Sequence, residues 1–161
     1  MPDIADNIKH SNLLTDVFGQ WPSFHDAEVI SMELFRDSGG ADIPKLRARI
    51  HVFEMTPEVD EQGHYVLKNH VLVMFLFHGI VENNIQHFNE QNVLQELSIV
   101  DISSRQLEFL HFEVDFLSLF GVEAKFKCQS VEIEAVVHID PPGRDGNPVQ
   151  SPPKAGAYKT N

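Results

Sequence analysis

The stretch VLVMFLF, residues 71–77, is apolar at every position and decides the fold. Seven apolar residues are too few to cross a membrane, and a run of this length is typical of a strand covered on both faces. One face would pack on the main core of a sheet. The other face needs a second cover, for which the N-terminal helix is our candidate. The sequence therefore predicts a β-sheet with this strand in its interior.

On both sides of this stretch the sequence alternates between apolar and polar residues, which is the period of a strand. The pattern is clearest in residues 45–52 (KLRARIHV) and in residues 131–139 (VEIEAVVHI). Because the turns between such segments are short, we expect about seven largely antiparallel strands in a meander-like sheet. The expected strands lie near residues 28–35, 45–52, 66–77, 93–102, 107–116, 122–128 and 131–139.

Other signals complete the predicted organisation. Ser11 can cap a short helix over residues 12–18, and Gly19 can end it. In residues 107–116 the alternation shifts by one residue, which indicates a bulge near Phe109 and Leu110. The fold class is therefore α+β, mostly β, with a single domain over residues 1–140. Residues 141–161 are rich in Pro and Gly and are predicted to be a disordered tail.

The charge balance is acidic, because 24 Asp and Glu against 12 Lys and Arg give a net charge of −12. Binding to nucleic acid depends on phosphate neutralisation by basic side chains, so we expect no nucleic-acid partner. A partner protein with a basic surface fits this charge, and so does acidity that only maintains solubility. We also expect no membrane partner, because no apolar run is long enough to span a bilayer. The polar N-terminus has no secretory signal.

Cys128 is the single cysteine, so the chain cannot form an internal disulfide or a thiolate zinc site by itself. It lies on the apolar side of a predicted strand, which indicates a small buried side chain rather than a nucleophile. The sequence contains no P-loop, GxSxG or GxGxxG motif. We therefore expect a cytoplasmic protein without catalytic residues and without a metal or other cofactor.

Two clusters of polar residues are candidate sites. His25 and Asp26, with Glu28 two residues later, could ligate a metal or act as an acid–base pair. The alternative is structural: Asp26 would satisfy backbone groups in a turn, and His25 would pack beside Trp21. The second cluster is an acidic loop at residues 56–63 (TPEVDEQG), which is either simply solvated or an anchor for basic side chains of a partner. Its candidate partner-binding residues are Glu54, Glu58, Asp60 and Glu61.

Three segments resemble the bacterial immunity protein 50 family. They are residues 18–29 (FGQWPSFHDAEV), residues 49–56 (RIHVFEMT) and residues 88–94 (FNEQNVL), and the resemblance covers about residues 10–140. The motif residues in the first segment, which we interpret as structural, are Trp21, Pro22, Phe24, His25, Asp26 and Glu28. The resemblance implies an immunity protein of a polymorphic toxin system, which binds a cognate toxin in the cytoplasm and neutralises it without catalysis.

Two other hypotheses remain beside this one. The first is a small-ligand or metal-binding enzyme that uses His25, Asp26 and Glu28. The second is an assembly module whose exposed edge strand pairs with another chain. A monomer and a homodimer both fit the sequence.

Overall fold

The computed structural model describes residues 3–36 and 43–140, and the tail expected at residues 141–161 lies outside them. Within the described residues, the chain forms two 3-10 helices, one α-helix and eight strands. The predicted fold class, mostly β and antiparallel with an N-terminal helix, is confirmed. In order, the elements are η1 (Ile4–Asn7), α1 (Asn12–Phe18), β1 (Glu28–Arg36), β2 (Pro44–Val59), β3 (Tyr65–His78), β4 (Val81–Gln86), β5 (Val93–Asp101), η2 (Ser103–Arg105), β6 (Phe112–Phe120), β7 (Glu123–Cys128) and β8 (Ser130–His138).

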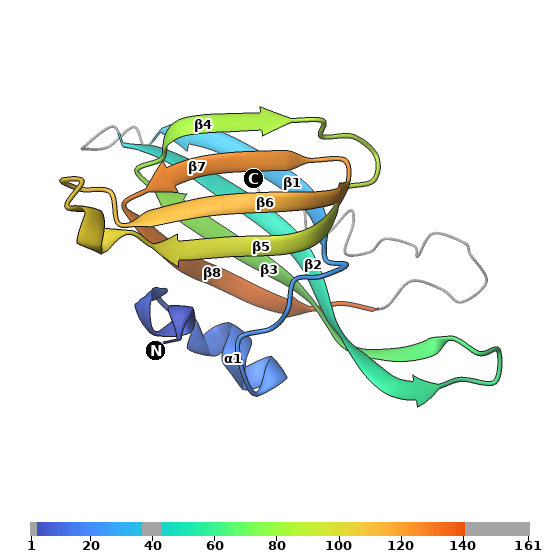
Figure 1. Cartoon of the computed structure of the whole chain (residues 1–161). Helices are drawn as coiled ribbons and strands as arrows, with labels where there is room; N and C mark the ends of the chain where they lie inside the picture. Colours follow the sequence, from blue (N-terminus) through green and yellow to red (C-terminus); the bar gives the residue numbers. More distant parts are fainter. Residues whose placement is uncertain (1–2, 37–42, 141–161) are drawn as a thin grey trace.

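The strands form one antiparallel sheet in the order β4-β7-β6-β5-β1-β2-β3-β8. It contains two meanders, β1–β2–β3 and β5–β6–β7, with β8 and β4 added at the outer edges. The two halves meet where β1 and β5 pair at Glu28 and Val93. Because this junction is short, the sheet folds over, and β4-β7-β6-β5 lies across β1-β2-β3-β8 as a second layer (Figure 1).

The core between the two layers is rich in phenylalanine. Phe77 of β3 meets Phe126 of β7 at a ring-centroid distance of 5.0 Å and Phe116 of β6 at 6.1 Å. All three side chains are almost fully buried. Burying such large apolar rings is the main favourable contribution to folding, so these contacts hold the two layers together.

The N-terminal helix closes one end of this core. Its Leu14 is fully buried and packs in the same cluster as Val73, Phe75 and Phe77. The helix therefore lies on the core side of β3, and our expectation that it covers the opposite face is wrong. It ends at Gly19, whose φ of 78° is the left-handed conformation that glycine adopts most easily.

Two local predictions differ from the structure. β4 was not expected, because its sequence VENNIQ lacks apolar alternation and it forms a mostly exposed edge of the sheet. The bulge near Phe109 and Leu110 is also wrong. Leu107 and Leu110 instead form a single bridge across a tight turn, and β6 begins only at Phe112. The shift in alternation marks that turn.

The hairpin of β2 and β3 is longer than the rest of the sheet. Residues 54–67, here called the arm, project beyond both layers (Figure 1). The sequence predicts a loop at residues 56–63, but the structure continues β2 to Val59 and starts β3 at Tyr65. Pro57 is compatible with this strand because the arm has only one partner strand, so the missing N–H can face solvent.

Candidate functional site

The segment WPSFHD lies between α1 and β1 and is fixed to the core by its aromatic residues. The Trp21 ring lies 5.7 Å from the Phe24 ring and 6.2 Å from the Phe75 ring, and Phe24 lies 5.7 Å from Phe75. Phe24 is buried and Trp21 is half-buried. The expected packing of both aromatic rings against the sheet is what the structure contains, and it positions the polar residues that follow.

Asp26 adopts an unusual backbone conformation, with a φ of 68°. Its backbone N–H donates to the carbonyl oxygen of Leu94 at 2.8 Å, which ties the segment to β5. Its carboxylate lies 3.7 Å from Nε2 of His25. We expected the side chain of Asp26 to accept hydrogen bonds from backbone groups in the turn. Within residues 3–36 and 43–140, no backbone N–H donates to this carboxylate, and only the main chain of Asp26 anchors the segment.

His25 is exposed and held at two points. Its Nδ1 lies 3.1 Å from the carbonyl oxygen of Gln95, where it can donate, and its backbone N–H donates to Oγ of Ser23. Glu28 begins β1 and is half-buried, and this burial raises the pKa of its carboxyl. In the described part of the chain, no three His, Cys, Asp or Glu side chains are arranged to hold a metal ion.

The four acidic residues proposed for partner binding lie along the arm. Glu54 at its base accepts a hydrogen bond from Nδ2 of Asn69 at 2.7 Å, while Glu58 and Glu61 are exposed. Asp60 has an additional role that sequence reasoning missed. Its Oδ1 accepts from the backbone N–H groups of Gln62 and His64, at 2.9 and 3.0 Å, and so organises the turn at the end of the arm.

A pair of histidines lies at the base of the arm. Nε2 of His51 and Nδ1 of His70 are 3.0 Å apart, and the ring of Phe53 packs 5.7 Å from the first and 5.6 Å from the second. Burial and the neighbouring His70 lower the pKa of His51 to about 4, and burial also lowers the pKa of His70. One signal for this cluster is visible in the sequence, because His51 and Phe53 lie two residues apart and so share a strand face.

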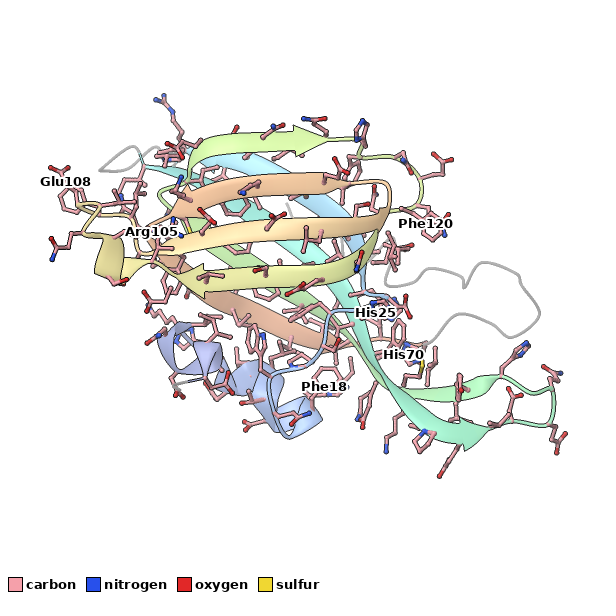
Figure 2. The ribbon with its side chains drawn as sticks, in the orientation of Figure 1. Phe18, His25, His70, Arg105, Glu108 and Phe120 are labelled. Carbon is pink, nitrogen blue, oxygen red and sulfur yellow. The ribbon has the colours of Figure 1, made fainter. Side chains whose placement is uncertain are left out.

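A cavity of about 370 Å3 opens between residues 20–26 and the base of the arm. Figure 2 shows two of its lining residues, Phe18 and His25, where the arm leaves the sheet. The cavity thus brings His25 and Asp26 of the first candidate cluster together with Glu54 of the second, while the other acidic residues of the arm do not line it. Its lining is Phe18, Gln20, Pro22, Ser23, His25, Asp26, Phe53, Glu54 and Met55.

Cys128 is fully buried, and burial raises the pKa of its thiol to about 12. At that pKa the reactive thiolate is scarce near neutral pH, which agrees with the interpretation of Cys128 as a small core side chain. Among residues 3–36 and 43–140, no helix has both the length and the apolar character needed to cross a bilayer.

The comparisons with known proteins point to one family. The family described as Immunity protein 50 matches residues 10–138, which extend from just before α1 to the end of β8. The comparisons with curated proteins and with solved structures gave no match. The matched residues include the WPSFHD segment, the arm and the cavity between them. Because the match covers most of the chain and every strand of the sheet, the chain belongs to the Immunity protein 50 family.

Proposed function

We propose that this protein is a non-catalytic immunity protein that binds a cognate bacterial toxin and neutralises it. The observation that carries the proposal is the family match, which spans residues 10–138. We place the interaction in the cytoplasm, where a single buried cysteine needs no oxidising environment. Inhibition would come from occupying a surface that the toxin needs.

We propose the arm as part of the toxin-binding surface. Met55 pairs with Leu67 across the hairpin, and Val59 pairs with Tyr65. Directly opposed residues share one face of a hairpin, and so do residues two positions apart on one strand. Met55, Val59 and Tyr65 are 51%, 57% and 60% exposed, which is unusual for apolar side chains grouped on one face. Such a surface is typical of the apolar centre of a protein interface.

The charge of the protein supports a basic partner. The net charge is −12, and Glu58 and Glu61 stand exposed near the end of the arm. Complementary charge accelerates the encounter of two proteins, especially at low ionic strength. Acidic residues on a projecting element therefore suit the binding of a basic toxin.

Co-expression with the toxin encoded beside the gene tests the proposal. We expect the protein to restore growth of cells that express this toxin and to co-purify with it as a stable complex. Deletion of residues 55–66, replaced by a short Gly-Ser linker, should abolish protection without unfolding the two layers. Failure of the intact protein to bind the toxin would contradict the proposed function. Full protection by the deletion variant would show that the arm is not part of the toxin-binding surface, but it would leave the proposed function intact.

A further inference from the structure

The cavity at the base of the arm is lined by acidic and by apolar side chains. Asp26 and Glu54 contribute carboxylates, and no Lys or Arg occurs among the described residues that line it. Glu54 receives one hydrogen bond, from Asn69 to Oε2. Within the described residues, Nε2 of His25 is the polar neighbour of the Asp26 carboxylate, at 3.7 Å. A carboxylate offers about four acceptor positions, so both groups retain capacity for a cationic donor.

The cavity is also lined by large apolar side chains. Phe18, Phe53 and Met55 line it, and together with the carboxylates they surround a volume of about 370 Å3. Sites of this size commonly take one compact group, with apolar walls and a few placed polar atoms. The ring of Phe53 is itself held in place by the rings of His51 and His70. Contacts within the protein therefore already position the Phe53 ring in the lining of the cavity.

We infer that this cavity receives an arginine side chain of the partner protein, an inference that rests on the proposed toxin-binding function. Arginine fits both the acidic and the aromatic lining residues, because its planar guanidinium binds carboxylates through paired N–H groups and stacks on aromatic rings. Its aliphatic stem suits the apolar lining residues. Lysine offers a point charge without the planar fork. Asp26, which the sequence analysis assigned to turn structure, becomes a partner-contacting residue.

The cavity is continuous with the apolar face of the arm, because Met55 belongs to both. A partner segment seated along Tyr65, Leu67 and Met55 would reach the cavity at the base of the arm. A second copy of this chain is a poor occupant. Each copy carries a net charge of −12, and its own arm would bring further carboxylates toward Asp26 and Glu54.

The affinity for the neighbouring toxin tests the inference with charge-matched variants. Asp26→Asn and Glu54→Gln remove one charge each inside the cavity. Glu108→Gln removes one charge from an exposed turn at the opposite end of the molecule (Figure 2). By calorimetry, we expect Asp26→Asn and Glu54→Gln each to weaken binding about 10- to 100-fold, mainly through faster dissociation. Glu108→Gln should bind within about twofold of wild type. Thermal melting of each variant verifies that it is folded.

Changes in the toxin identify the side chain. Its exposed arginines are replaced one at a time by Gln and by Lys, and each is combined with Glu54→Gln. One arginine should show strong coupling to Glu54, and its lysine variant should bind at least tenfold more weakly. If the lysine variant binds as well as wild type, the inference of an arginine is wrong. If light scattering finds a dimer of the wild type that Glu54→Gln dissociates, the occupant is a second copy.

A short peptide separates this inference from the proposed function. Acetyl-Gly-Arg-Gly-amide, titrated into the 15N-labelled protein, should shift the amide signals of residues 23–26 and 53–55, and the citrulline analogue should not. The Asp26→Asn, Glu54→Gln double variant should lose these shifts. Specific shifts with the arginine peptide but no toxin binding would overturn only the function. Toxin binding that Asp26→Asn and Glu54→Gln leave unchanged would overturn only the inference.

Discussion

The pKa values of His51 and His70 depend on the burial of both rings, and that of His51 also depends on the contact between them. They share a hydrogen-bonding distance of 3.0 Å beneath the ring of Phe53, and both have lowered pKa values. A proton on either ring would have to enter a partly desolvated site beside another imidazole. The folded protein therefore favours the neutral forms, and the unfolded chain takes up protons more readily.

This pair should make stability depend on pH. The pKa of His51 is about 4 in the folded protein, below the ordinary value of 6.5. As the pH falls from 6.5 to 4, the unfolded chain binds a proton that the folded chain does not, so stability is present above this window and is lost within it. We expect a loss of about 2–3 kcal/mol from this source. Urea unfolding of His51→Gln should show a shallower pH dependence, while His138→Gln, an exposed control, should keep the wild-type slope.

The aromatic residues of the WPSFHD segment give a second prediction. Phe24 is 4% exposed and contacts both Trp21 and Phe75. Phe24→Ala should lower the free energy of unfolding by about 3–5 kcal/mol, as other large core truncations do. Trp21→Ala should cost less, because Trp21 is half-buried. Equilibrium urea unfolding measures both losses of free energy. A larger loss for Trp21→Ala than for Phe24→Ala would contradict the prediction that the buried Phe24 ring is the main anchor of the WPSFHD segment.

The arm is the element whose form differs most from its sequence pattern. TPEVDEQG contains the residues of a loop, yet only its second half turns, because β2 continues to Val59, which pairs with Tyr65 of β3 after an irregular stretch that follows Met55. Thr56 supports this pairing: it is buried, and its hydroxyl donates to the carbonyl oxygen of Val66 at 2.7 Å. A contact of this kind with the opposite strand cannot be predicted from the residues next to Thr56 in the sequence.

Asp60 should hold the end of the arm. Its carboxylate accepts from two backbone N–H groups, so Asp60→Ala would leave both dependent on water. We expect a loss of about 1 kcal/mol in local stability. Hydrogen exchange at the amides of Gln62 and His64 should accelerate several-fold, while Glu61→Ala leaves these rates unchanged. Equal effects of both variants would show that charge, rather than the hydrogen bonds of Asp60, organises the turn.

Glu58 and Glu61 provide the test of electrostatic steering, without the structural cost attached to Asp60. The double variant Glu58→Gln, Glu61→Gln should fold normally, because exposed changes usually alter stability by less than about 0.5 kcal/mol. Its association with the toxin should be several-fold slower at low ionic strength, with a weaker dependence on salt. Stopped-flow kinetics measures both quantities. An unchanged association rate would show that Glu58 and Glu61 do not accelerate the encounter with the toxin.

At the scale of the whole molecule, the sequence predicted the strands that have one face in the core. Residues 45–52 and 131–134 alternate because each has a buried and a more exposed side. Beyond Ile133 a register shift in β8 ends the alternation, so Val136 packs against the core and Val137 is exposed. β4 escaped prediction because it is an edge strand with little buried surface. The order of the strands depends on contacts such as Phe77 with Phe126, which join residues far apart in the chain and leave no local signal.

The candidate site was predicted in pieces for the same reason. The HD motif and the acidic residues of the arm were each visible in the sequence. The position of Glu54 beside His25 and Asp26 in one cavity depends on the short β1–β5 junction and on the length of β2. Neither can be deduced from residue patterns, because both are set by how the two layers pack.

The position of β8 has a consequence for folding during synthesis. β1, β2 and β3 can pair as soon as they are made, because each is linked to the next by a short segment, whereas β8 joins β3 only near the end of the chain. Until then, the apolar edge at residues 71–77 lacks its second neighbour. Unpaired apolar strand edges are the usual starting points of aggregation. We therefore expect chains that stop before Ser130 to aggregate, and chains that include β8 to remain in solution.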